Sequence, residues 1–125
     1  MFDEQRAVTL ASMNPDGSIH AVAMFAVAHE ERVVFLTKER AQKVRNIERD
    51  PRVTVAASTP DGGIQIRGHA EIVDDPVRLE PLARRFLARR AGPPATEADM
   101  ARALHRRVAI SVTPLRTLTW SRWVC

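Results

Sequence analysis

Hydrophobic and polar positions along the chain follow the two-residue period of β-strands more often than the period of a helix. Residues 6–13 and 18–27 are rich in strand-forming side chains, and the turn sequence NPDG at 14–17 separates them. A third run of this kind occupies 33–37, after the polar stretch 28–32. Short turns between successive strands predict an antiparallel meander in this half of the chain.

The second half of the chain carries further strand signals. Residues 52–58 form an apolar run that ends at the turn sequence TPDGG. Residues 64–73 alternate regularly, so that Arg67 lies on a polar face while the isoleucines occupy the opposite face. The last two strands are expected at 107–114 and 115–123.

A helix is expected between the third and fourth strands. Ala41, Val44 and Ile47 are spaced three apart and form one apolar stripe. Thr37 is the predicted N-cap, and Asp50-Pro51 predicts the end of the helix. The polar residues expected to lie away from the stripe are Lys38, Gln42, Arg45, Asn46 and Arg49.

Two more helical segments follow the strand at 64–73. The sequence DDP at 74–76 predicts the start of a helix that extends to about Arg90. Pro81 is expected to disturb its middle, so a first turn followed by a helix from Pro81 is the alternative. Thr96 and Asp99 have the spacing of a capping box, which predicts a short third helix.

These elements define the expected fold class. About seven strands and two or three helices, with strands mainly following strands, predict a mostly β protein with peripheral helices. A doubly wound parallel sheet would require strands and helices to alternate. No repeat, low-complexity tract or linker interrupts residues 1–125, which are therefore expected to form a single domain.

The charge balance favours an anionic partner, with a solvated arginine-rich surface as the alternative. The net charge is +4 and the sequence pI is about 10.5. A small nucleic-acid-binding barrel would present aromatic side chains on a basic strand face. Aromatic residues make up only 5% of this chain, and its basic cluster lies mainly on the first helix. We therefore expect no nucleic-acid partner.

Cysteine content and hydropathy limit the cellular setting. Cys125 is the single cysteine, which excludes an internal disulfide and a cysteine-rich metal site. No apolar run approaches the roughly 20 residues that a membrane span requires, and the first residues lack a signal-peptide core. The expected location is the cytoplasm, with no membrane span.

Most catalytic signatures are missing from the sequence. The five glycines form no phosphate-binding loop, and no serine lies in a nucleophile-elbow pattern. No metal site is expected, because metal-ligand spacing is missing among the four histidines, His20, His29, His69 and His105. An enzyme with this sequence therefore depends on a cofactor for its chemistry.

Three cations occupy an unfavourable position at the expected start of the first helix. The dipole of a helix favours acidic residues there, yet the chain has Lys38, Arg40 and Lys43. A phosphate held by free backbone N–H groups would make these cations favourable, and Gln42 would lie beside it. The alternative is a surface helix whose cations point into solvent.

The motifs in this order resemble a known superfamily. VVFLT at 33–37 is followed by a basic helix and DPRV at 50–53, and then by RGHAEIVDDP at 67–76. This pattern is similar to the flavin/deazaflavin oxidoreductase superfamily, which has the split β-barrel fold of the pyridoxamine 5'-phosphate oxidases. The resemblance covers residues 5–76 well, and 108–123 looks like the closing strands of that family.

The resemblance implies a homodimer with its active sites at the subunit interface. The strand-to-helix segment would hold the cofactor phosphate, with Thr37, Lys38, Gln42 and Lys43 as the candidates. The implied contacts of the cofactor ring are Val22, Ala23 and Met24. The implied contributions of the partner subunit are Ser58, Thr59 and Arg67, with Trp120 or Trp123 closing the pocket.

The resemblance also bears on the choice of cofactor. FMN-dependent oxidases of the family typically have Ser-Arg-Lys at the helix start, whereas this chain has Ala41-Gln42-Lys43. The motifs look closer to the branch that uses the deazaflavin coenzyme F420, whose acidic tail a basic groove would accommodate. The groove candidates are Lys38, Arg40, Arg45 and Arg49.

The expected function is therefore hydride transfer between the reduced deazaflavin and a small organic acceptor. The alternatives are an FMN-dependent oxidoreductase resembling pyridoxamine 5'-phosphate oxidase and a non-catalytic barrel that binds a flavin or a tetrapyrrole.

Overall fold

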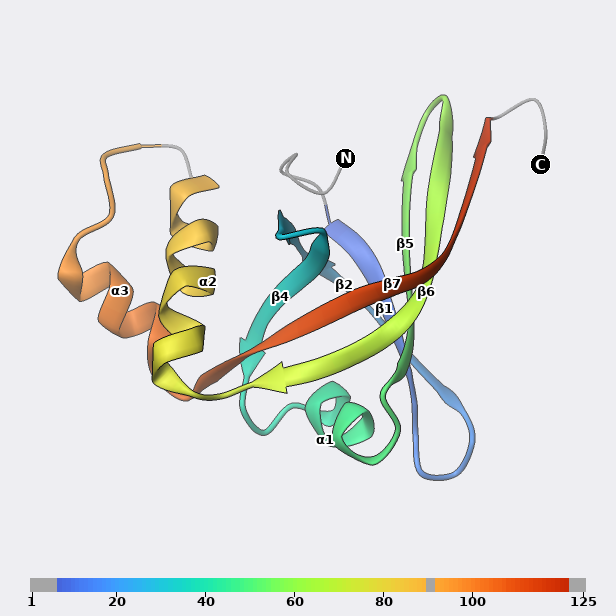
Figure 1. Cartoon of the computed structure of the whole chain (residues 1–125), viewed down its shortest axis with the longest axis horizontal. Coiled ribbons are helices and arrows are strands. Elements are labelled where there is room, and N and C mark those ends of the chain that lie inside the picture. The colour runs from blue at the N-terminus through green and yellow to red at the C-terminus, as the bar shows by residue number, and fades with distance from the viewer. Residues whose placement is uncertain (1–6, 90–91, 122–125) are drawn as a thin grey trace.

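The computed structural model describes residues 7–89 and 92–121 (Figure 1). One antiparallel sheet of seven strands has the order β2-β1-β5-β6-β7-β4-β3. The strands are β1 (Ala7–Met13), β2 (Ile19–Phe25), β3 (Val27–His29), β4 (Arg32–Lys38), β5 (Arg52–Thr59), β6 (Gly62–Val73) and β7 (Arg107–Ser121). The helices are α1 (Gln42–Arg49), α2 (Pro76–Arg89) and α3 (Glu97–Leu104).

The connection between the two edge strands closes the sheet into a barrel. β2 and β3 lie at opposite edges of the sheet, yet only the fully buried Ala26 separates them in the chain. Because one residue spans only about 3.5 Å, the sheet must curl until its two edges meet. The strand expected at 18–27 is therefore two strands, since the chain changes partner from β1 to β4 at Ala26.

The interior of the curled sheet is the main hydrophobic core. Phe35 of β4 and Leu10 of β1 are completely buried there, together with Val55 of β5 and Ile110 of β7. Ile47 of α1 joins this cluster and covers one end of the barrel, at the bottom of Figure 1. Full burial of one such side chain contributes roughly 1.5–3 kcal/mol, so this interior is a major source of the stability of the fold.

A second apolar cluster lies on the outer face of part of the sheet. Val34 of β4 and Ala109 of β7 are buried there against Leu79 and Leu82 of α2. Figure 1 shows α2 and α3 gathered on this side of the barrel. On the outer face of β1 and β2, no helix of the described chain covers the exposed side chains. These are Ala7 and Thr9 of β1 and Ile19, Ala21, Ala23 and Phe25 of β2.

The helical predictions are largely confirmed. Asp50 ends α1, and Thr96 forms a capping box with Asp99 through backbone-to-side-chain bonds of 3.1 and 2.9 Å. Pro81 lies inside α2 without interrupting it. The neighbouring residues Leu79 and Leu82 pack against the sheet, and this tertiary contact outweighs the local cost of a proline.

The end of the chain differs from the prediction. The two strands expected at 107–114 and 115–123 are one strand, β7, which continues through Pro114. Pairing with β6 changes register here, because Gly68 faces Pro114 whereas Arg67 faces Arg116. The extra residue forms a bulge, where a proline without an N–H is tolerated. The last part of β7 and the β5–β6 hairpin form an arm that projects from the barrel in Figure 1.

No helix in the described part of the chain is both long and apolar enough to cross a membrane.

Candidate functional site

The candidate site lies where β4 leads into α1. Thr37 is not the N-cap, because β4 remains paired with β7 as far as Lys38 opposite Arg107. Thr37 is buried on the interior face of β4, on the same side as Phe35. The helix instead begins at Gln42, four residues after β4 ends at Lys38, so Thr37 is too far from it to be its cap.

This start of α1 carries positive charge without compensation. Ala41 is the N-cap and makes no side-chain capping bond, and no acidic residue lies in the first turn. Lys43 is half-buried in that turn, and burial lowers the pKa of its ammonium group. Among the described residues, no hydrogen bond uses the backbone N–H of Gln42 or Lys43. Free N–H groups beside a desolvated cation match the requirements of a phosphate.

The other two cations of the sequence pattern belong to a neighbouring hollow. Lys38 ends β4 and Arg40 lies in the turn before α1, so only Lys43 is part of the helix. A hollow of about 450 Å³ brings Lys38, Glu39 and Arg40 together with His105, Arg106 and Arg107. The last three residues were not predicted, because the pairing of β4 with β7 joins segments almost 70 positions apart in the chain.

Two predicted members of the basic groove are engaged elsewhere. Arg45 donates to the carbonyl of Arg40 and, at 2.7 Å, to the side chain of Gln42. Arg49 donates to the carbonyl of Met13 at the far end of the helix. The basic hollow around Lys38 therefore replaces the helix face as the place where cations gather.

Asn46 is the main correction to the predicted helix surface. It was expected on the polar side of α1, yet its side chain is completely buried. Its Nδ2 donates to Ser12 Oγ at 3.1 Å and to Asn14 Oδ1 at 3.0 Å, and its Oδ1 accepts from Gln42 Nε2 at 2.9 Å. These bonds fix α1 against β1 and the turn that follows β1, and they use the Gln42 amide for structure.

A buried histidine atom adjoins this network. His20 lies opposite Ser12 in the pairing of β1 with β2. Its Nδ1 is buried and makes no hydrogen bond within the described structure. The sequence did not predict that His20 lies beside this network, because its position depends on the register of two strands and on the position of α1.

The predicted ring contacts lie on an edge of the sheet. β2 pairs only with β1 among the described strands, so the backbone groups on its other side have no partner strand. Val22 and Met24 point inward and are half-buried, and Met24 packs against the core. Ala23 points outward and is exposed. Their contact with a cofactor stays a prediction.

The residues expected from a partner subunit lie away from this start of α1. Ser58 near the end of β5 and Arg67 of β6 are both exposed on the outer face of the sheet. Trp120 packs across Gly63, where an added Cβ would lie 2.5 Å from the indole ring. Trp123 lies outside the described residues. One chain alone therefore does not bring these residues to the phosphate candidates.

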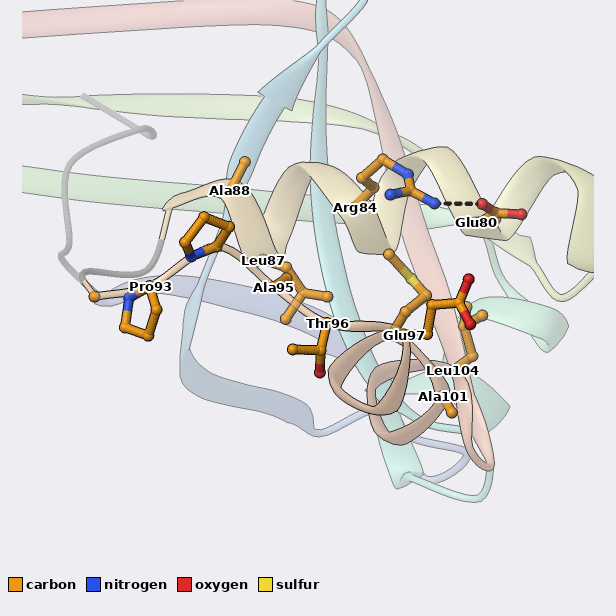
Figure 2. A pocket seen from close by; sticks show the side chains of 13 residues that line it. Glu80, Arg84, Leu87, Ala88, Pro93, Ala95, Thr96, Glu97, Ala101 and Leu104 are labelled. Atoms are coloured by element: carbon orange, nitrogen blue, oxygen red, sulfur yellow. Dashed lines mark hydrogen bonds and ion pairs between the residues drawn. The ribbon is translucent and has the colours of Figure 1, made fainter.

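The hollow between α2 and α3 is not a candidate for the predicted cofactor site. A hollow of about 730 Å³ lies between α2 and α3, and none of the predicted site residues lines it (Figure 2). On α2, beside this hollow, the Glu80–Arg84 ion pair measures 2.7 Å. Among the described residues, no three His, Cys, Asp or Glu side chains are grouped to hold a metal ion.

The curled antiparallel sheet, with helix α1 following β4 at one end, is a split β-barrel. The sequence matches the family described as pyridoxamine 5'-phosphate oxidase over residues 1–121. The chain belongs to this family of split-barrel proteins, which bind flavin-type cofactors, and the resemblance found in the sequence is confirmed. Among curated proteins, none matches the chain.

Solved structures agree with this assignment. An F420 reductase is 30% identical, with a TM-score of 0.73 over 94% of this chain and 92% of that chain. A conserved hypothetical protein of Mycobacterium tuberculosis is 29% identical, with a TM-score of 0.84 over 95% and 79%. A putative pyridoxamine 5'-phosphate oxidase of Listeria innocua, 16% identical over 94% and 90%, shares the fold with a TM-score of 0.70. The F420 reductase supports the deazaflavin branch.

The Asn46 network generates a prediction about stability. Asn46→Ala leaves the buried hydroxyl of Ser12 without its partner, so the free energy of unfolding should fall by about 1–3 kcal/mol. Urea denaturation at one fixed protein concentration measures this loss. Glu48→Ala, on the exposed side of the same helix, is the control and should change the value by less than about 0.5 kcal/mol. Equal effects of the two substitutions would contradict the anchoring role.

Proposed function

We propose that the protein is an F420-dependent oxidoreductase that transfers hydride between the reduced deazaflavin and a small organic acceptor. The observation that supports the proposal is the start of α1, where half-buried Lys43 and two unpaired backbone N–H groups have no acidic residue in the first turn to compensate them. The 30% identity with an F420 reductase supports the choice of coenzyme. FMN is the alternative cofactor.

The free energy gained by binding a phosphate at α1 exceeds the cost of placing a cation there. A hydrogen bond to a charged group contributes roughly 1.5–3 kcal/mol when it is partly desolvated. A cation at a helix N-terminus costs about 0.3–1 kcal/mol. One well-placed phosphate therefore outweighs the unfavourable position of Lys43, and Lys38 at the end of β4 adds a second cation to the same end of the barrel.

The basic hollow next to α1 suits the acidic tail of the coenzyme. Its lining includes Lys38, Arg40, Arg106 and Arg107 with Glu39 as the single acid. The phosphodiester at Lys43 and the tail carboxylates beyond it would both meet positive charge. FMN ends at its phosphate and would leave this hollow without a ligand.

In this proposal the chain positions the coenzyme and the acceptor and excludes water, and it supplies no catalytic side chain. The apolar side chains of Val22 and Met24 would exclude water from one side of the ring, and the free edge of β2 would offer backbone hydrogen bonds. The bound reduced coenzyme would supply the hydride, and the acceptor would take up a proton from solvent. Holding the two reactants together converts their encounter into an intramolecular step.

We further propose that the protein is a homodimer through the uncovered outer face of β1 and β2. Ile19 and Phe25 are 66% and 59% exposed there, and the small side chains of Ala21 and Ala23 lie between them. An exposed apolar face of this kind favours association. A cytoplasmic location stays a prediction.

The role of Lys43 can be tested by substitution. Lys43→Ala should weaken binding of F420 at least about tenfold, because a charge-assisted bond to the phosphate is lost. Fluorescence titration of the apo-protein measures the dissociation constant. Arg84→Ala removes one positive charge on α2 and should leave the affinity unchanged.

The pKa of Lys43 adds a second readout for the same substitution. Burial lowers this pKa, so the ammonium loses its proton at a lower pH than an ordinary lysine. The affinity of the wild-type protein should fall as the pH rises through that value, and Lys43→Ala should remove this part of the pH dependence. An unchanged affinity and pH profile in the variant would contradict the phosphate site.

The dimer face can be tested with the apo-protein, by its oligomeric state alone. Ala23→Arg places a charge in the centre of the proposed interface, so the variant should be monomeric by light scattering at micromolar concentration. Ala101→Arg, on exposed α3, should stay dimeric like the wild type. A monomeric wild-type protein, or a dimeric Ala23→Arg variant, would contradict the proposed interface.

A further inference from the structure

Two arginines lie side by side on the outer face of the projecting arm. Arg67 of β6 and Arg116 of β7 are directly opposite each other in the strand pairing, and both are exposed. Side chains at such positions have their Cβ atoms about 4.5–5.5 Å apart, and like charges there weaken the sheet. The chain therefore maintains an arrangement that is unfavourable without an anion.

The nearby acids are already paired with other cations. Glu71, the acid on the same face of β6, lies 2.7 Å from Arg78 and 3.7 Å from Arg32. Glu71 and Arg67 therefore do not pair with each other, although they lie on the same face of β6. Within the described chain, the side chains of Arg67 and Arg116 make no ion pair and no hydrogen bond.

Asp50 is engaged in the same way. It lies 2.7 Å from Arg52, whose guanidinium lowers the pKa of the Asp50 carboxyl to about 2. Asp50 therefore remains ionised at neutral pH and forms its ion pair with Arg52. The two arginines of the arm have no acid left among these neighbours.

The surface around the arginines is hollowed and partly apolar. Arg67 lines two hollows, of about 350 and 280 Å³. Ile19 and Leu115 line the first, and Leu118 and Arg116 line the second. The indole of Trp120 extends the apolar surface along β7. The combination suits an anion that carries an apolar body.

We propose that Arg67 and Arg116 form a binding site for the carboxylate of an apolar, ring-containing organic acid. Two facing arginines would offer N–H donors to both oxygens of one carboxylate, the anion whose planar shape the guanidinium group matches. Leu115 and Leu118 contact the body of the ligand on either side of this charged pair.

The carboxylate has two possible sources, which are the acceptor of the reaction and the acidic tail of the coenzyme. The apolar lining favours the acceptor, because a tail of glutamates is polar along its length. In this respect the inference rests on the proposed function and specifies its substrate class. The facing arginines and the hollows beside them belong to the arm, so the proposed site does not depend on α1.

The test uses the apo-protein with 2-naphthoate and, as its neutral counterpart, 2-naphthamide. Titration by calorimetry should show naphthoate binding at least about tenfold more tightly than the amide. Arg67→Gln/Arg116→Gln should remove that preference while leaving the melting temperature unchanged or higher, because a repulsion is lost. Arg84→Gln/Arg102→Gln removes two charges from α2 and α3 and should retain the preference.

Three outcomes would overturn the inference. Equal binding of acid and amide by the wild type would show that the arginines do not recognise a carboxylate. Weaker binding of F420 by the double variant, with naphthoate binding intact, would assign the pair to the coenzyme tail. A shift of the monomer–dimer equilibrium without any change in naphthoate binding would assign it to the subunit interface. None of these results involves Lys43, so the proposed function is tested separately.

Discussion

The one-residue connection at Ala26 is the constraint on which the rest of the structure depends. It joins strands at the two opposite edges of the sheet, so the sheet has to curl into a barrel. Curling creates an interior that Phe35 and Leu10 fill completely. It also leaves an open end, which Ile47 of α1 covers, and thereby fixes the place where β4 turns into the helix. The candidate cofactor site is a consequence of that turn.

Polar contacts then position the charged groups. Asn46 ties α1 to β1, and the pairing of Lys38 with Arg107 keeps β4 extended to the edge of the barrel. Lys43 consequently stays half-buried without an acid, and the remaining cations gather in the hollow beside it. The three misplaced cations of the sequence thus have three different local structures, yet they lie near the same end of the fold.

The sequence predicted the elements better than their contacts. The alternation in 64–73 and the capping box at Thr96 depend on neighbours in the chain, and both appear as expected. The N-cap role of Thr37 failed because a long-range ladder holds that residue in a strand. The burial of Asn46 and the facing pair Arg67 and Arg116 likewise depend on strand register, which periodicity does not determine.

The central claim is that the start of α1 and its basic hollow bind a deazaflavin coenzyme rather than FMN. A side-by-side fluorescence titration of the apo-protein with F420 and with FMN tests it most directly. We expect tight binding of F420 and weak binding of FMN, because the acidic tail would meet the cations around Lys38 in addition to the phosphate site. Tight binding of FMN, or binding of neither cofactor, would contradict it.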